Sequence, residues 1–71
     1  MRFGTVRCYD CQVGFGWIKP NDGGHEVAVN ESSVKSAGLG QLAAGQILGF
    51  QVGAGQRGPV AINLWATWSN R

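Results

Sequence analysis

Charged residues are scarce in this sequence, and neither sign forms a cluster. Only 14% of the 71 residues are Asp, Glu, Lys or Arg, and the formal net charge is +2. The basic residues are spread along the chain at Arg2, Arg7, Lys19, Lys35, Arg57 and Arg71. There is no basic tract that would attract nucleic acid by charge alone. Any attraction to phosphate must therefore come from how the fold places these few cations.

Long hydrophobic runs are also absent. No apolar stretch approaches the roughly 20 residues that a membrane-spanning helix needs, and residues 1–4 do not open the apolar segment of a signal peptide. We therefore expect a soluble cytoplasmic protein with no membrane partner. A hydrophobic content of 44% is typical of a globular chain. The length predicts a single domain, 1–71, near the lower size limit for a self-supporting core.

Groups that carry out catalysis are few and scattered. His25 is the only histidine, and the acidic side chains lack a base or nucleophile that the sequence pattern would bring close. The glycines on either side of Phe15 lack the lysine and the serine or threonine of a phosphate-binding loop. The sequence therefore predicts no enzyme activity, no cofactor and no small-molecule substrate. His25 follows two glycines, and we expect it to be exposed.

The chain has only two cysteines, Cys8 and Cys11, in a C-x-x-C spacing. A redox pair with that spacing normally opens a helix after a strand, because the helix N-terminus lowers the thiol pKa. Here the pair lies at the end of a predicted strand and in the turn that follows. A structural zinc site needs two more ligands, and the chain has one histidine. Reduced thiols are the favoured interpretation, and a local disulfide or a metal contact is the alternative.

What the sequence does contain is an aromatic pair spaced by glycine, in Gly14-Phe15-Gly16-Trp17-Ile18. Residues two apart in a strand point the same way, so Phe15 and Trp17 stand side by side and Ile18 faces the core. The glycines indicate a bend, a bulge or the close approach of another backbone. Exposed ring pairs are what unpaired nucleobases need, because every base has a π-face. The motif therefore predicts a binder of single-stranded nucleic acid.

Short strands separated by turn signals make up the rest of the chain. Periodicity and β-forming residues predict strands at 3–9, 15–18, 27–30, 47–52 and 60 to about 65. Leu48, Phe50 and Val52 lie in phase in the fourth strand. Five short strands need closure to protect their edges, and a small, partly open barrel provides it. The prediction is an all-β fold with its core at about 3–66.

The stretch between the third and fourth predicted strands lacks a clear period. We expect residues 32–34 to cap one short helical turn. Leu39 and Leu42 are then placed to hold the remaining loop against the barrel.

Several short motifs follow one another in a specific order, namely Gly4-Thr5-Val6-Arg7, Gly14-Phe15-Gly16-Trp17-Ile18, Asp22-Gly23-Gly24, Val27-Ala28-Val29, Gly45-Gln46 and Gly58-Pro59-Val60-Ala61-Ile62-Asn63-Leu64. Together they resemble the bacterial cold-shock protein family from Gly4 to about Leu64. The resemblance implies a five-stranded antiparallel barrel of the oligonucleotide/oligosaccharide-binding type, the OB-fold. It also implies binding of single-stranded RNA and DNA with little sequence preference, and action as an RNA chaperone or transcription antiterminator.

The chain departs from the family pattern on its binding motifs. The typical Lys-Trp-Phe-Asn is Arg-Cys-Tyr-Asp here, at 7–10, and a family lysine is replaced by Val13. The family's Val-Phe-Val-His, often followed by another aromatic, is Val-Ala-Val-Asn-Glu at 27–31. The resemblance places Cys8 on the binding face, although strict alternation from Val6 would turn it inward. We therefore expect a local bulge in the first strand.

The candidate nucleic-acid-binding residues are Arg7, Tyr9, Phe15, Trp17, Lys19, Ala28, Asn30 and Arg57. A stacked base contributes about 1–3 kcal/mol per aromatic ring. Losing the family's platform positions at Cys8, Ala28 and Asn30 would therefore weaken binding by several kcal/mol. We expect binding that is weak, salt-sensitive and less selective for pyrimidines than is usual in the family, with no metal involved.

Each candidate residue also has an interpretation without nucleic acid. Phe15 and Trp17 could form a protein contact, and Tyr9 could pack against the barrel rim. The cationic side chains could be solvated surface charges. Trp65 and Trp68 lie at or past the end of the family match, and we favour for them a place over the barrel base or in a subunit contact. The alternative function is a barrel with an eroded binding face that serves as a protein-interaction or self-associating module, and hence a homo-oligomer.

Overall fold

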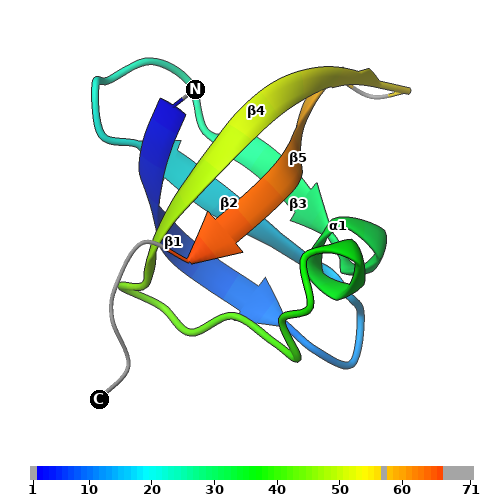
Figure 1. The fold of residues 1–71 in the computed structure, drawn as a ribbon. Coiled ribbons are helices and arrows are strands. Elements are labelled where there is room, and N and C mark those ends of the chain that lie inside the picture. The colour runs from blue at the N-terminus through cyan, green and yellow to red at the C-terminus, as the bar shows by residue number, and fades with distance from the viewer. Residues whose placement is uncertain (1, 57, 67–71) are drawn as a thin grey trace.

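Five strands and one short helix make up the fold (Figure 1). The computed structural model describes residues 2–56 and 58–66. In chain order the elements are β1 (Arg2–Asp10), β2 (Phe15–Pro20), β3 (Val27–Asn30), α1 (Glu31–Ser36), β4 (Ile47–Gly55) and β5 (Gly58–Ala66). All five predicted strands are confirmed. β4 continues to Gly55 and β5 begins at Gly58, so the two strands form a longer hairpin than predicted. No helix in the two described ranges is long and apolar enough to cross a membrane.

The strands close into a barrel in the order β1-β2-β3-β5-β4. Neighbouring strands are antiparallel except β3 and β5, which run parallel and share the register pair Ala28 and Val60. A ring with an odd number of strands cannot alternate direction at every junction. The predicted all-β barrel is therefore confirmed, and its antiparallel description is corrected at this one junction.

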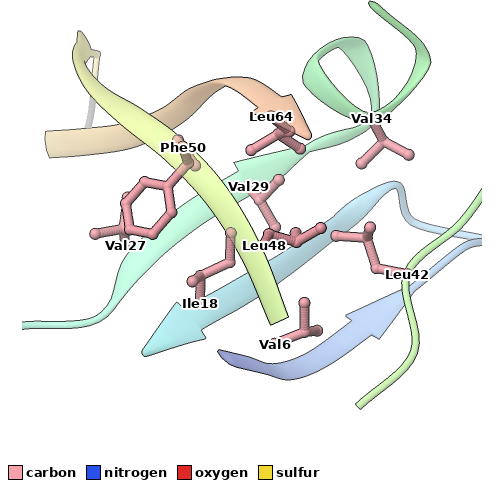
Figure 2. Close-up of a cluster of buried hydrophobic side chains, with 10 residues drawn as sticks. Val6, Ile18, Val27, Val29, Val34, Leu42, Leu48, Phe50 and Leu64 are labelled. Carbon is pink, nitrogen blue, oxygen red and sulfur yellow. The ribbon is translucent and has the colours of Figure 1, made fainter. Parts of the chain in front are cut away.

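Apolar side chains fill the inside of the barrel (Figure 2). The buried members are Val6, Ile18, Val27, Val29, Val34, Leu42, Leu48, Phe50, Ala61 and Leu64. Leu42 comes from the loop before β4, and Leu39 packs partly against the same cluster, as predicted for this loop. Val52 lies in phase with the buried Phe50 but is 41% exposed. The reason is that β4 and β5 project from the barrel at the end where Gly55 pairs with Gly58 (Figure 1).

An irregularity in β1 turns the second half of this strand. The register of β1 against β2 shifts between Val6 and Cys8, so Arg7 is the extra residue of a β-bulge. Cys8 is consequently exposed instead of following Val6 into the core. A Cβ atom on Gly16 of β2 would collide with the carbonyl oxygen of Cys8. The predicted bulge and the predicted close approach of a backbone at a glycine are both confirmed, and they occur side by side.

Helix α1 is capped by Asn30 and not by the serines that follow it. Asn30 has an extended backbone with φ −116° and ψ 171°, and its Oδ1 accepts a hydrogen bond of 3.0 Å from the Ser33 backbone N–H. The Ser33 hydroxyl instead donates to the Ala61 carbonyl oxygen of β5 at 2.9 Å. Val34 is the buried residue of the helix. The predicted helical turn is confirmed, and its predicted cap at 32–34 is wrong.

Candidate nucleic-acid interface

Outward side chains of β1, β2 and β3 lie in rows across the sheet. Cys8, Trp17 and Ala28 are neighbours in one row, and Phe15 and Asn30 are neighbours in the next. We call these five residues the stacking face. Each of them is exposed or half-buried, while the alternate residues of β2 and β3 are buried. The β1 bulge is what brings Cys8 into this surface.

Phe15 and Trp17 present their rings to solvent, as the sequence predicts. Their ring centroids are 5.3 Å apart and their planes meet at 86°, an edge-to-face pair. Phe15 is 41% exposed, whereas the inward Ile18 of the same strand is fully buried. Trp17 is half-buried and keeps part of its ring surface in contact with solvent. The two rings are therefore available to unpaired bases.

The neighbours of this pair are small. Cys8 and Ala28 stand on either side of Trp17 in the register, at positions where the family motif has aromatic rings. Neither side chain offers a flat surface for a base. The platform on the stacking face is therefore limited to two rings.

Arg7 is exposed, but a carboxylate of the protein already binds it. Its Nε lies 2.6 Å from Oε2 of Glu26, the residue just before β3. No sequence signal indicated this pair, because it depends on where the bulge turns the Arg7 side chain. The guanidinium charge is therefore partly neutralised at the edge of the stacking face.

Lys19 is the candidate cation that keeps its charge free. It is exposed at the end of β2, and within the described ranges no carboxylate forms an ion pair with it. The other described cations are paired: Arg2 with Asp22 at 3.2 Å and Lys35 with Glu31 at 3.3 Å, in addition to Arg7. Arg57 lies outside the described residues.

Tyr9 lies on the other side of β1 from the stacking face. It pairs with Gly16 in the register, and its half-buried ring packs against the hydrophobic core. Burial raises the pKa of the Tyr9 phenol above its usual 10.0, and the nearby negative charges of Glu31 and Cys11 act in the same direction. Lys35 opposes them. This geometry favours the rim-packing interpretation of Tyr9 over a stacking role.

Asn30 and Glu31 place polar groups beside Phe15. The Asn30 Oδ1 is occupied by the cap of α1, which leaves its amide group at the edge of the stacking face. The Glu31 backbone N–H donates to the Gly14 carbonyl oxygen at 2.8 Å, and a Cβ on Gly14 would lie 3.0 Å from Cβ of Glu31. Glu31 is therefore held over Gly14, the residue before Phe15, and its carboxylate is the one that pairs with Lys35.

The remaining reactive groups do not gather into a second centre. Cys8 and Cys11 are free thiols, and both are exposed. His25 is exposed in the turn before β3, as predicted. Among residues 2–56 and 58–66, no three His, Cys, Asp or Glu side chains are placed to hold a metal ion together.

Comparison with known proteins explains this arrangement. The family model of the "Cold-shock" DNA-binding domain matches residues 2–67, nearly the whole chain. The chain belongs to the cold-shock domain family. This is a family of nucleic-acid-binding domains and not of enzymes. The resemblance inferred from the order of the sequence motifs is thereby confirmed.

Named relatives agree with the family match. This cold-shock domain is 41% identical to the cold shock-like protein CspC of Shigella flexneri over 63 residues, which cover 89% of this chain and 91% of the relative. It is 40% identical to CspC of Escherichia coli over the same shares of both chains. It is also 44% identical to cold shock domain-containing protein 4 of Arabidopsis thaliana over 64 residues, 89% of this chain and 32% of that longer protein.

Proposed function

We propose that this protein binds single-stranded RNA or DNA on its stacking face and keeps RNA unfolded, as an RNA chaperone or transcription antiterminator in the cytoplasm. Bases stack on Phe15 and Trp17, and Lys19 contacts the backbone phosphates. The observation that carries the proposal is the solvent-facing edge-to-face pair, 5.3 Å between ring centroids. Because stacking does not distinguish one base from another strongly, sequence preference is low. Neither a metal nor a cofactor takes part.

The structure supports weaker binding than a full set of family motifs would give. Two rings remain on the platform, and each absent ring lowers the binding free energy by about 1–3 kcal/mol. Glu26 competes with phosphate for Arg7, and Glu31 likewise pairs with Lys35. We therefore expect an affinity that is measurable at low ionic strength and falls as salt is added.

Replacing Phe15 tests this function directly. We expect Phe15→Ala to weaken binding of an oligothymidylate by about 1–3 kcal/mol, because one stacking surface is removed. The melting temperature should change little, since Phe15 is 41% exposed. Fluorescence anisotropy of a labelled oligonucleotide gives the affinity, and circular dichroism gives the melting temperature.

Val52→Ala is the matched control, because Val52 is also 41% exposed but lies on β4, outside the stacking face. It should leave binding unchanged. In a parallel experiment, oligonucleotide should quench the emission of Trp17, and the Trp17→Phe variant identifies that signal among the three tryptophans of the chain. Equal affinities of wild type and Phe15→Ala, or a large loss of stability with binding intact, would show that Phe15 is not a platform.

The second candidate function is a protein-interaction or self-associating module. Val13, at a position where the family has lysine, favours it, because this apolar side chain is 72% exposed beside the stacking face. If this is the function, the protein should not bind oligonucleotide even at low salt. Its molecular mass should rise with concentration in sedimentation equilibrium. Binding that salt reverses would instead support the nucleic-acid function.

A further inference from the structure

A second aromatic pair lies on the outside of the barrel. Phe3 of β1 and Trp65 of β5 are 47% and 36% exposed. Their ring centroids are 6.1 Å apart and their planes meet at 81°, the same edge-to-face geometry as in the stacking face. For Trp65, the sequence favours a place over the barrel base or in a subunit contact, and Trp68 lies outside the described residues. The structure places Trp65 on the outer surface of the sheet.

Gly49 of β4 makes this pair possible. It stands between Phe3 and Trp65 in the strand register. A Cβ atom on Gly49 would lie 2.5 Å from Cε2 and Cζ2 of Trp65, so the indole rests directly on the glycine backbone. The inner face of the indole is therefore covered and its outer face is turned to solvent. The ring of Phe3 stands nearly perpendicular to the indole, at 81°.

The unpaired cation of the described chain lies between the two aromatic pairs. Lys19 is two residues beyond Trp17 on β2, and it faces Thr5 of β1 in the register. Thr5 is in turn two residues from Phe3. Because the alternate residues of both strands are buried, all four side chains lie on the outer side of the sheet. The surface is therefore continuous from one pair of rings to the other, through a free ammonium group.

We propose that Phe3 and Trp65 form a second stacking site for the same single strand of nucleic acid, with Lys19 holding the phosphate backbone between the two sites. This inference rests on the proposed function and extends it. Trp17 and Phe3 are about 13 Å apart along the strands at roughly 3.3 Å per residue, whereas neighbouring stacked bases are separated by roughly 3.4 Å. The two pairs therefore hold different nucleotides. A strand just long enough to cover the stacking face cannot reach both pairs, whereas a longer strand can.

The test compares a short and a long oligothymidylate, a hexamer and a dodecamer. Both should bind wild type, and the dodecamer should bind more tightly. In Phe3→Ala/Trp65→Ala, hexamer affinity should be unchanged, while dodecamer affinity should fall by about fivefold or more, the lower limit for one stacked base. Val52→Ala is again the control and should keep the full gain with length. Unchanged hexamer binding also shows that the double variant is folded.

Amide chemical shifts of the wild type provide a measurement that needs no variant. We expect the signals of Phe3 and Gly49 and the indole N–H of Trp65 to shift with the dodecamer and not with the hexamer. If the affinities of wild type and double variant rise equally from hexamer to dodecamer and these signals do not move, the second site is excluded while the proposed function stands. If the hexamer fails to bind wild type, the proposed function fails and the second site with it. A dimer that the double variant dissociates, with no length effect, would assign this surface to a second copy of the chain.

Discussion

At the scale of single residues, the protein itself engages several side chains that the family pattern assigns to ligand. Asn30 caps α1, Arg7 pairs with Glu26, and Tyr9 packs against the core. Each of these contacts uses a polar group or ring that the family resemblance predicts to face nucleic acid. What remains for bases on the stacking face is the Phe15–Trp17 pair. Affinity therefore depends on these rings more heavily than it would on a platform with many aromatic residues.

Titration of Tyr9 tests its placement at the barrel rim. It is the only tyrosine of the chain, so absorbance at the phenolate band reports on it alone. We expect the pKa of Tyr9 to lie above 10.0, since burial and then the Glu31 charge disfavour the phenolate. Glu31→Gln should bring the pKa closer to that usual value.

The same shift makes stability depend on pH in alkaline solution. The unfolded chain releases the Tyr9 proton near its usual pKa of 10.0, while the folded chain retains it to higher pH. The contribution of Tyr9 is therefore complete below that pH and is lost as the pH rises through the folded pKa. Urea unfolding at several pH values should show this decline, and Tyr9→Phe should remove the Tyr9 part of it. A usual pKa in the folded protein would place the ring in solvent.

At the scale of elements, local pattern predicted the strands because the alternation of apolar and polar residues is a local property. The bulge at Arg7 was predictable only from the family resemblance, since strict alternation turned Cys8 inward. The Arg7–Glu26 ion pair and the Phe3–Trp65 contact could not be predicted, because both join segments distant in sequence whose register the pattern does not determine. The prediction placed the cap of α1 at 32–34 and not at Asn30, because the two serines after Asn30 are also common capping residues.

Gly16 tests the close approach of β1 and β2. We expect Gly16→Ala to lower the free energy of unfolding by about 1–3 kcal/mol or more, the range for an overpacked interior. The added Cβ would collide with the backbone of Cys8, and backbone cannot rotate away as a side chain can. Gly40→Ala is the control, because no atom lies within 4 Å of the added Cβ there. Equal stability of the two variants in urea would mean that the strands separate at the bulge without cost.

At the scale of the whole molecule, ion pairs occupy most of the described cations, although they leave the net charge of +2 unchanged. Arg2, Arg7 and Lys35 each contact a carboxylate, so attraction of phosphate falls largely to Lys19 among the described cations. Exposed ion pairs of this kind contribute little to stability. Their effect on the surface potential is larger, because they decide which positive charges a polyanion meets.

Glu26→Gln should convert Arg7 into a phosphate contact. We expect tighter oligonucleotide binding at low salt, and a plot of log affinity against log salt that is steeper by about 0.7, the value for one contact with a single strand. The gain should disappear in Arg7→Gln/Glu26→Gln, which serves as the control. Titrations at several salt concentrations measure both effects. A slope that stays the same in Glu26→Gln would show that Arg7 does not reach the backbone of the ligand.

The parallel junction of the barrel has a consequence for how the ring of strands stays shut. β3 and β5 meet at one register pair, whereas β4 and β5 are matched along most of their length. Across that narrow seam the Ser33 hydroxyl ties α1 to the Ala61 carbonyl, and Val34 sinks into the core beside it. The helix thus holds β3 and β5 together where the strands themselves share only one register pair. Asn30 of the stacking face caps the first turn of this helix, so the contact that closes the barrel begins at the edge of the stacking face.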